Sequence, residues 1–142
     1  MRLRRPFLFL FLVIGIVAPV SLRAAEEPPA EQPVVVPIDA DGVQRLTMVL
    51  DSYSYSPNHV IVQSGHPVEF LLRSVTVITP HNFILKEEAS GLSLDHDVGA
   101  GKNSVLRFTP TQKGIFPFYC DKKLLFFASH REKGMEGKLE VR

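Results

Sequence analysis

The stretch GIFPFYCDKKLLFFASHREKGMEGKLEVR, residues 114–142, decides how the rest of the chain is interpreted. It holds the only cysteine of the sequence, Cys120, followed by His130 and Met135. Phenylalanines alternate with other residues before Cys120, which is typical of a half-buried β-strand because successive side chains of a strand point to opposite faces. Cys120 is in phase with these phenylalanines, so we expect it on the buried face where this strand ends.

Four side chains could together bind one metal ion. With His81 far upstream, this stretch offers one thiolate, two imidazoles and one thioether, the ligand set of a mononuclear blue copper site. Zinc could bind the same nitrogen and thiolate donors, but a thioether is a poor zinc ligand, so Met135 favours copper. Gly134 gives the backbone the freedom to bring the Met135 sulfur to the metal. We therefore predict one copper ion, alternating between Cu(I) and Cu(II), bound by His81, Cys120, His130 and Met135.

The first 24 residues resemble a secretory signal peptide. Arginines at the start precede an apolar run over residues 7–20, and small residues follow around Ala24 and Ala25. The apolar run is shorter than the roughly 20 residues that a membrane-spanning helix needs. We predict cleavage near Ala24 or Ala25 and export, in a bacterium to the periplasm. The alternative is a retained N-terminal membrane anchor.

Composition limits what the remaining chain can do. Without residues 1–24 the chain carries 12 basic and 15 acidic residues, a formal charge of −3, so nucleic-acid binding has no electrostatic basis. Residues 25–42 are rich in Pro, Glu and Ala and are predicted to form a tether, with residues 34–36 able to join a sheet edge. Residues 43–142 have the size of one small domain, and its lone cysteine has no partner for an internal disulfide.

The domain has the sequence pattern of an all-β protein. Short apolar and β-branched runs are separated by Pro, Gly and Asn turns, and outside the signal peptide no stretch shows helical periodicity over three turns. Several such strands predict a sandwich or barrel. We expect residues 59–63 and 68–72 to form a hairpin, and residues 86–102 to be a long loop or a short helix. The remaining expected strands are residues 44–55, 103–109, 115–120 and 138–142.

Four motifs resemble those of small cupredoxins of the plastocyanin, pseudoazurin and azurin type. Residues 114–120 are similar to the strand that ends in the copper cysteine, and residues 134–141 are similar to the axial methionine followed by the last strand. Residues 80–83 resemble the first-histidine motif, and residues 57–70 resemble the early Pro, Val and Gly pattern. Each motif is weak alone, but four in the same order are specific.

The resemblance implies a cupredoxin-like Greek-key β-sandwich over residues 43–142 with the same four ligands. It also implies that Asn82 fixes the loops and hydrogen-bonds near the Cys120 sulfur, a position from which it would tune the copper potential. The function that it implies is the transfer of single electrons between redox partner proteins, without catalysis. Two alternatives stay open: a periplasmic carrier or chaperone of Cu(I), and a catalytic site with an open coordination position, as in red copper relatives.

The chain departs from the family between Cys120 and His130. Nine residues, 121–129, separate them, more than is common in cupredoxins. The insertion contains an apolar run that could pack over the site or serve as a docking surface for redox partners. We expect it to pack over the site, because apolar runs are more often buried. The run consists of Leu124, Leu125, Phe126 and Phe127.

Other reactive side chains have simpler interpretations. His59, His66 and His96 are expected in turns or on the surface, and His96 with its aspartate neighbours is a weak candidate for an incidental second metal site. No nucleophile with an adjacent base emerges, since Ser129 next to His130 in sequence says nothing about triad geometry. The sequence therefore does not predict an enzyme.

Overall fold

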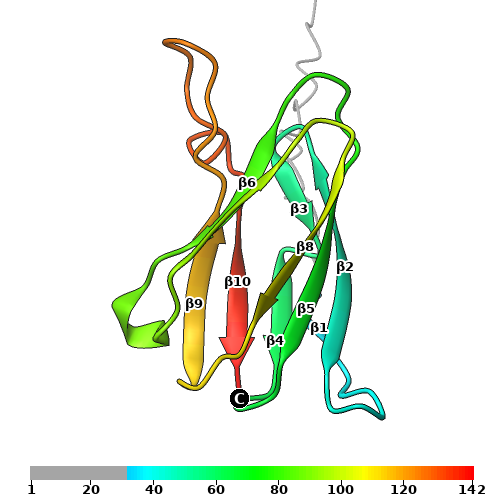
Figure 1. Ribbon diagram of the computed structural model, residues 1–142. Coiled ribbons are helices and arrows are strands. Elements are labelled where there is room, and N and C mark those ends of the chain that lie inside the picture. The colour runs from blue at the N-terminus through cyan, green and yellow to red at the C-terminus, as the bar shows by residue number, and fades with distance from the viewer. Residues whose placement is uncertain (1–31) are drawn as a thin grey trace, which may run out of the picture.

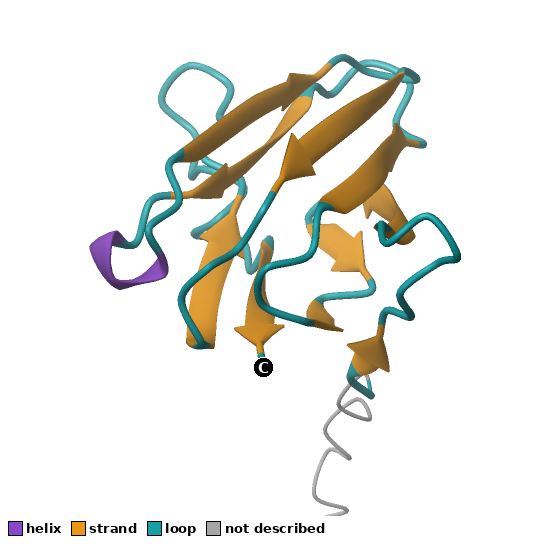
Figure 2. Ribbon diagram, turned by 60° about the horizontal axis from the view of Figure 1, so that its bottom comes forward, coloured by secondary structure: helices purple, strands orange, loops and turns teal. Residues whose placement is uncertain are grey.

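A computed structural model describes residues 32–142. They form ten strands and one short 3-10 helix, arranged as two sheets with the hydrophobic core between them (Figures 1 and 2). The all-β sandwich expected from the sequence is confirmed. The predicted signal peptide and the first part of the tether lie outside the described residues. No helix within residues 32–142 is long and apolar enough to cross a membrane.

The chain passes repeatedly from one sheet to the other, as in a Greek key. The larger sheet has the order β1-β4-β10-β9-β6-β7 and the smaller one β3-β2-β5-β8. β1, β4 and β10 run parallel to one another, as do β2 and β5, and the other pairs are antiparallel. The larger sheet comprises β1 (Val34–Val35), β4 (His59–Val62), β10 (Glu136–Val141), β9 (Gly114–Tyr119), β6 (His81–Leu85) and β7 (Leu94–Val98). The smaller comprises β3 (Ser54–Ser56), β2 (Gln44–Asp51), β5 (Val68–Ser74) and β8 (Asn103–Phe108).

The hairpin expected from residues 59–63 and 68–72 is wrong. β4 pairs with β1 and β10, whereas β5 pairs with β2 and β8 in the other sheet. The turn between β4 and β5 therefore carries the chain across the sandwich. Both strands do bury their predicted faces, since Val60, Val62 and Val68 are in the core. The two-residue period predicted burial correctly, but burial does not specify which strand is the neighbour.

The segment expected to be a loop or short helix contains the 3-10 helix η1 (Glu88–Ser90) and the edge strand β7. β7 is polar because edge strands face water on one side. Its aspartates do not form a metal site: Asp95 lies 2.7 Å from the Lys86 amine and Asp97 2.6 Å from that of Lys122. His96 instead lies 2.6 Å from the Ser104 hydroxyl.

Part of the predicted tether joins the domain. Val34 and Val35 pair in parallel with β4, and the side chain of Val36 is buried in the core. The expectation that residues 34–36 join a sheet edge is confirmed. The ordered sandwich therefore begins within the segment that its composition marked as a tether.

Aromatic rings fill the core beneath one end of the sandwich. The Phe118 ring stacks on Phe83 at 4.6 Å and meets the edge of Tyr55 at 5.1 Å. The backbone is equally close-packed here, because a Cβ atom on Gly137 would overlap the Asn58 carbonyl oxygen and the Phe118 ring. Dense packing of this kind fixes where β9 and β10 end, and the candidate functional residues follow directly from those ends.

Candidate metal centre

Cys120 and Met135 are brought together by the pairing of β9 and β10. Cys120 follows the last residue of β9, and Met135 precedes the first residue of β10. Tyr119 pairs with Glu136, and in the next pair the Cys120 N–H donates to the Met135 carbonyl oxygen at 3.1 Å. The antiparallel register thus sets the two sulfur-bearing residues side by side. They lie at the end of the sandwich where β9 ends and β10 begins (Figure 1).

His81 reaches the same end because β6 lies antiparallel to β9. Ile84 of β6 is opposite Tyr119, so β6 begins where β9 ends and its first residue, His81, lies beside Cys120. His130 comes from the loop between β9 and β10. Its N–H donates to the Lys122 carbonyl oxygen at 2.8 Å, which closes the base of the loop and returns His130 to the site.

The three strongest donors form one compact cluster. The ligating atoms of His81, Cys120 and His130 all lie within 4.8 Å of one another, and the Cys120 Sγ is 3.3 Å from His130 Nδ1. All three side chains are buried; His130, at 6 % exposure, alone reaches the surface. It is the one such donor group in the part of the chain that the structure describes.

An unsatisfied nitrogen indicates that the cluster is suited to a metal. His81 Nδ1 is buried and has no hydrogen-bond partner. A buried polar atom without a partner is costly, and native proteins leave few of them. A metal ion bound between the thiolate and the two imidazoles would satisfy this nitrogen. The donors therefore fit the copper ion that their chemistry predicts.

Met135 and Asn82 both lie next to Cys120 in the structure. Met135 is fully buried, and the preceding Gly134 has a φ of +95°, a conformation that L side chains rarely adopt. The Asn82 backbone N–H points to the Cys120 Sγ at 3.5 Å. Its side-chain amide donates to the Asp121 carboxylate at 2.8 Å and accepts from the Asp121 N–H at 3.1 Å. This two-point contact, which the sequence did not reveal, fixes the residue after the cysteine.

Burial controls the protonation of the cluster. It raises the pKa of the Cys120 thiol, an effect opposed by the backbone N–H groups of Asn82 and Lys122 that hydrogen-bond the sulfur. Burial, together with the nearby His130, lowers the pKa of His81 to about 4. The pKa of His130 is also lowered, by burial and by Lys133. Both imidazoles are thus neutral at neutral pH, as metal ligation requires.

Tyr53 forms the outer wall of the site. Its ring meets the His130 ring edge-on, with centroids 5.2 Å apart. The Lys133 amine lies over the Tyr53 ring at 4.3 Å and donates to its hydroxyl at 3.0 Å. Sequence reasoning missed Tyr53, because nothing in its local pattern links it to a histidine far along the chain.

The apolar run of the insertion does not pack over the site, so that expectation is wrong. The side chains of Leu124, Leu125, Phe126 and Phe127 are between 53 % and 86 % exposed. The Phe127 N–H donates to the Leu124 carbonyl oxygen at 3.0 Å, and Leu125 has a φ of +50°. These features form a tight turn, which directs the side chains outward rather than down onto the sandwich.

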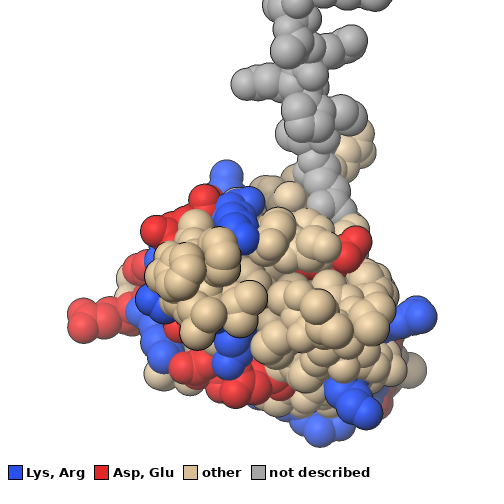
Figure 3. All heavy atoms as spheres, turned by 90° about the horizontal axis from the view of Figure 1, so that it is seen from above, with Lys and Arg blue, Asp and Glu red and all other residues tan. Residues whose placement is uncertain are grey.

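A second loop adds apolar side chains at the same end. Val77 and Ile78, between β5 and β6, are 89 % and 86 % exposed. Together with the four exposed residues of the insertion they form what we call the apolar face. Figure 3 shows this end as an area of uncharged atoms with Lys, Arg, Asp and Glu around it. Contiguous exposed apolar surface of this kind commonly marks an interaction site.

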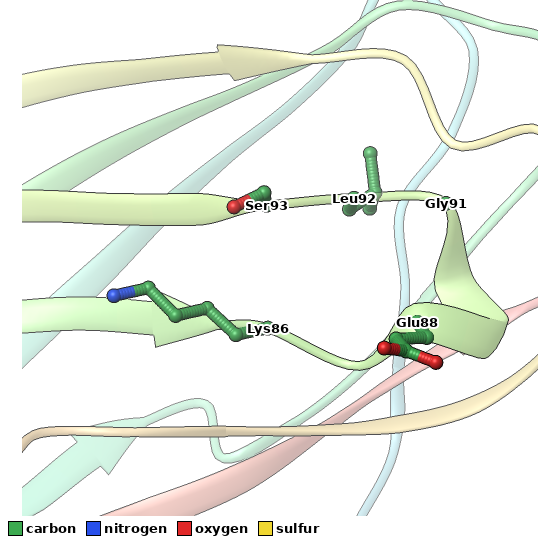
Figure 4. Close-up of a pocket in the computed structure, with 5 residues that line it drawn as sticks. All are labelled: Lys86, Glu88, Gly91, Leu92 and Ser93. Atoms are coloured by element: carbon green, nitrogen blue, oxygen red, sulfur yellow. The ribbon is translucent and has the colours of Figure 1, made fainter.

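His130 lies at the foot of a groove beside the apolar face. The groove has a volume of about 260 Å³ and is lined by Ile78, Thr79, Pro80, Lys122, Lys123, Leu124 and His130. A different hollow lies around η1, at the opposite end of β6 from His81 (Figure 4). It is lined by Lys86, Glu88, Gly91, Leu92 and Ser93. The groove is therefore the one of these two hollows that reaches a candidate metal ligand.

A buried Cys and two His beside a Met, at one end of a two-sheet β-sandwich, define a mononuclear copper protein. The family follows from the sequence itself: the model of the cupredoxin-like domain matches residues 11–139, and the chain belongs to this family. It is a copper-binding cupredoxin. A search of curated protein sequences finds no significant match.

Solved structures share this fold. The metal-binding domain of the Cu(I)-exporting P-type ATPase CopA of Streptococcus pneumoniae D39 is 22 % identical, with a TM-score of 0.61, over 79 % of this chain and 97 % of that one. Auracyanin A, a "blue" copper protein of Chloroflexus aurantiacus, is 16 % identical, with a TM-score of 0.55, over 71 % and 100 %. The copper-containing nitrite reductase of Thermus scotoductus SA-01 is 19 % identical, with a TM-score of 0.56, over 82 % of this chain and 29 % of its own length.

Proposed function

We propose that this cupredoxin carries single electrons between redox partner proteins, with His81, Cys120, His130 and Met135 as its copper ligands. The observation that carries the proposal is the compact donor cluster, in which the ligating atoms of His81, Cys120 and His130 lie within 4.8 Å of one another. A site that need not rearrange between oxidation states loses little energy to reorganisation. Bound copper supplies the one-electron Cu(I)/Cu(II) couple.

The chain holds the donors by means that do not depend on the metal. The hydrogen bond between Cys120 and Met135 continues the β9–β10 ladder, and Asn82 fixes Asp121 from two sides. The N–H groups that point to the Cys120 sulfur withdraw charge from the thiolate. Hydrogen bonds of this kind tune the reduction potential of a metal site.

Electrons would enter and leave through His130. It is the one proposed ligand at the wall of the groove, and Ile78 and Leu124 of the apolar face also line that groove. We propose that redox partners dock here, because burying exposed apolar side chains favours association while excluding water between the two metal sites. Docking around Leu124, Leu125, Phe126 and Phe127 would give the long insertion its role.

The proposed location is outside the cytoplasm, in a bacterium the periplasm. The basic start, the apolar run of residues 7–20 and the small residues near Ala24 support it. Mass spectrometry of the protein purified from its native host would test it, with a mature N-terminus near Ala25 as the expected result. An intact Met1 on soluble protein would contradict export by a cleaved signal peptide.

The competing function is that of a Cu(I) carrier. Because the chain shares its fold with a domain of a Cu(I)-exporting ATPase, an experiment should distinguish electron transfer from copper delivery. The experiment combines protein-film voltammetry with competition for Cu(I) by a chelator. An electron carrier should cycle reversibly and retain its copper when reduced. Release of the ion on reduction, or to a chelator that leaves the Cu(II) form intact, would instead support copper delivery.

A catalytic site with an open position is tested by Met135→Leu. If Met135 is the axial ligand, the variant should change the visible spectrum and shift the potential while copper stays bound. A spectrum and potential unaffected by the substitution would favour an open site. Met48→Leu is the matched control, since Met48 is equally buried but lies on β2, outside the donor cluster.

A further inference from the structure

The hydroxyl of Thr76, in the loop between β5 and β6, sits at the centre of a small polar network behind His81. Its Oγ1 lies 2.6 Å from the Thr79 carbonyl oxygen, 3.0 Å from the Ser74 hydroxyl and 3.2 Å from His81 Nε2. His81 and Ser74 are buried. Thr76 and Thr79 are half-buried, so the network lies where the loop meets the core.

Counting protons fixes the direction of each hydrogen bond. A hydroxyl has one proton to donate and two lone pairs that accept. The Thr79 carbonyl oxygen can only accept, so the Thr76 proton must go to it. The other two neighbours must then donate to Thr76, which means that His81 Nε2 carries a hydrogen. If it did not, the Thr79 carbonyl oxygen and His81 Nε2 would both need the single Thr76 proton.

An independent observation agrees with this direction. A neutral imidazole has one N–H and one nitrogen with a free lone pair. With the hydrogen on Nε2, the lone pair is on Nδ1, the buried nitrogen that has no hydrogen-bond partner. The other tautomer would place a buried N–H there with nothing to accept it, which is costly.

We propose that Thr76 is a positioning residue: it holds His81 in the Nε2–H tautomer, so that Nδ1 faces Cys120 and His130 ready to bind copper. The proposal rests on the proposed role of His81 as a ligand. Its physical meaning is that copper binds His81 without removing a proton from it or turning its ring. Partners behind a ligating histidine commonly contribute tenfold to hundredfold to metal affinity.

The same hydroxyl links the site to the apolar face. The contact between Thr76 and the Thr79 carbonyl oxygen spans the exposed loop tip formed by Val77 and Ile78. The loop that contributes to the proposed docking surface is thus closed by the residue that orients His81. The sequence gives no sign of this, because Thr76 lies in a segment that resembles an ordinary loop.

The test reads the tautomer directly in metal-free protein. Nitrogen NMR of the histidine rings at alkaline pH distinguishes Nε2–H from Nδ1–H, and the wild type should show His81 as Nε2–H alone. Thr76→Val keeps the shape and removes the hydroxyl, so it should give a mixture of tautomers. Thr76→Ser restores the hydroxyl and should restore the wild-type signals. Copper affinity, measured by chelator competition, should fall by about tenfold to hundredfold in Thr76→Val alone.

Ser104→Ala is the matched control. Ser104 bonds the Nε2 of His96, a histidine on β7 outside the cluster, at 2.6 Å. Its loss should leave the His81 tautomer and the copper affinity unchanged. His81 found as Nδ1–H in the wild type would overturn the proposal without needing a variant, as would a Thr76→Val protein with an unaltered tautomer. If the tautomers behave as expected but His81→Ala binds copper normally, the positioning stands and the ligand role of His81 fails.

Discussion

The strand ends and the loop between them differ sharply, although they are adjacent in sequence. Cys120 and Met135 are completely buried and joined by a backbone hydrogen bond, whereas residues 124–127 project into solvent. The first region is fixed by sheet register and core packing. The base of the second is held by the His130–Lys122 hydrogen bond, the Asn82–Asp121 contacts and the Lys122–Asp97 ion pair, whereas its apolar tip is formed by its own turn. Site and surface can therefore change independently.

The energetics of loops explain why the insertion leaves the site intact. Lengthening a loop from two to nine residues costs only about 1.3 kcal/mol in closure entropy. The added residues leave the sandwich after Asp121 and return at His130, so they need not displace a strand. The comparison predicts that substitutions at the strand ends affect metal binding and folding, whereas substitutions in the loop affect neither.

The largest effect is expected at Cys120. Cys120→Ser removes the thiolate, so copper-loaded protein should lose its thiolate-to-copper absorption completely, and copper affinity should fall by at least about a hundredfold. Visible spectroscopy and chelator competition measure the two effects. Phe126→Ala in the insertion is the control and should change neither, because the Phe126 side chain is 86 % exposed. Retention of the visible band in Cys120→Ser would exclude Cys120 as the ligand.

A single methyl group should disrupt the strand-end region next most strongly. Gly137→Ala places a Cβ against the Asn58 carbonyl and the Phe118 ring, so we expect a loss of about 3 kcal/mol of unfolding free energy in urea. Gly65→Ala meets nothing within 4 Å and only strains a φ of +79°, so its loss should be about 1 kcal/mol. Equal losses of unfolding free energy in the two variants would show that close packing around Gly137 does not fix the ends of the strands.

The stability of metal-free protein should depend on pH through His81. Its pKa is about 4 in the folded protein and 6.5 in the unfolded chain, so the unfolded state binds more protons between these values. Stability should therefore decrease as pH falls from about 7, by about 2 kcal/mol at pH 5 from this group. Urea unfolding at several pH values measures this decrease. His81→Asn should remove that part of the slope, and an unchanged slope would contradict the buried neutral imidazole.

The smallest effect on folding is expected in the loop. Replacing both Phe126 and Phe127 with Ser should change the unfolding free energy by less than about 0.5 kcal/mol and leave the copper spectrum unaltered. Electron transfer to a small inorganic oxidant should also be unaffected, whereas transfer to a docking protein should slow. A loss above about 1 kcal/mol would show that these rings contribute to the packing of the domain.

Local sequence patterns predicted most of the strands and much of the candidate site, but residues 44–55, expected as one strand, form the two antiparallel strands β2 and β3. The alternation before Cys120 and the glycine before Met135 are short-range signals, and both correspond to observed structure. Strand pairing is a long-range property, so the hairpin of residues 59–63 and 68–72 was predicted wrongly. β7 was missed because Leu94 and Val98 are its only apolar residues, and the aspartates between them are typical of a loop.

The residues around the ligands were the least predictable. Thr76 and Tyr53 approach the histidines across loops, and a hydroxyl or a ring in a loop carries no sequence signal of its own. The apolar run of residues 124–127 was also wrongly predicted to pack over the site. Hydrophobic side chains become buried only where the backbone directs them toward the core. A tight turn with Leu125 at positive φ prevents that here.

The central claim is that the buried strand ends form a blue copper site, and the spectrum of the copper-loaded wild type tests it most directly. Visible absorption and electron paramagnetic resonance should be recorded on protein containing one Cu(II) per chain. Ligation by the Cys120 thiolate, His81 and His130 predicts an intense thiolate-to-copper charge-transfer band with unusually small copper hyperfine splitting. Weak absorption with the large hyperfine splitting of tetragonal Cu(II) would contradict the account.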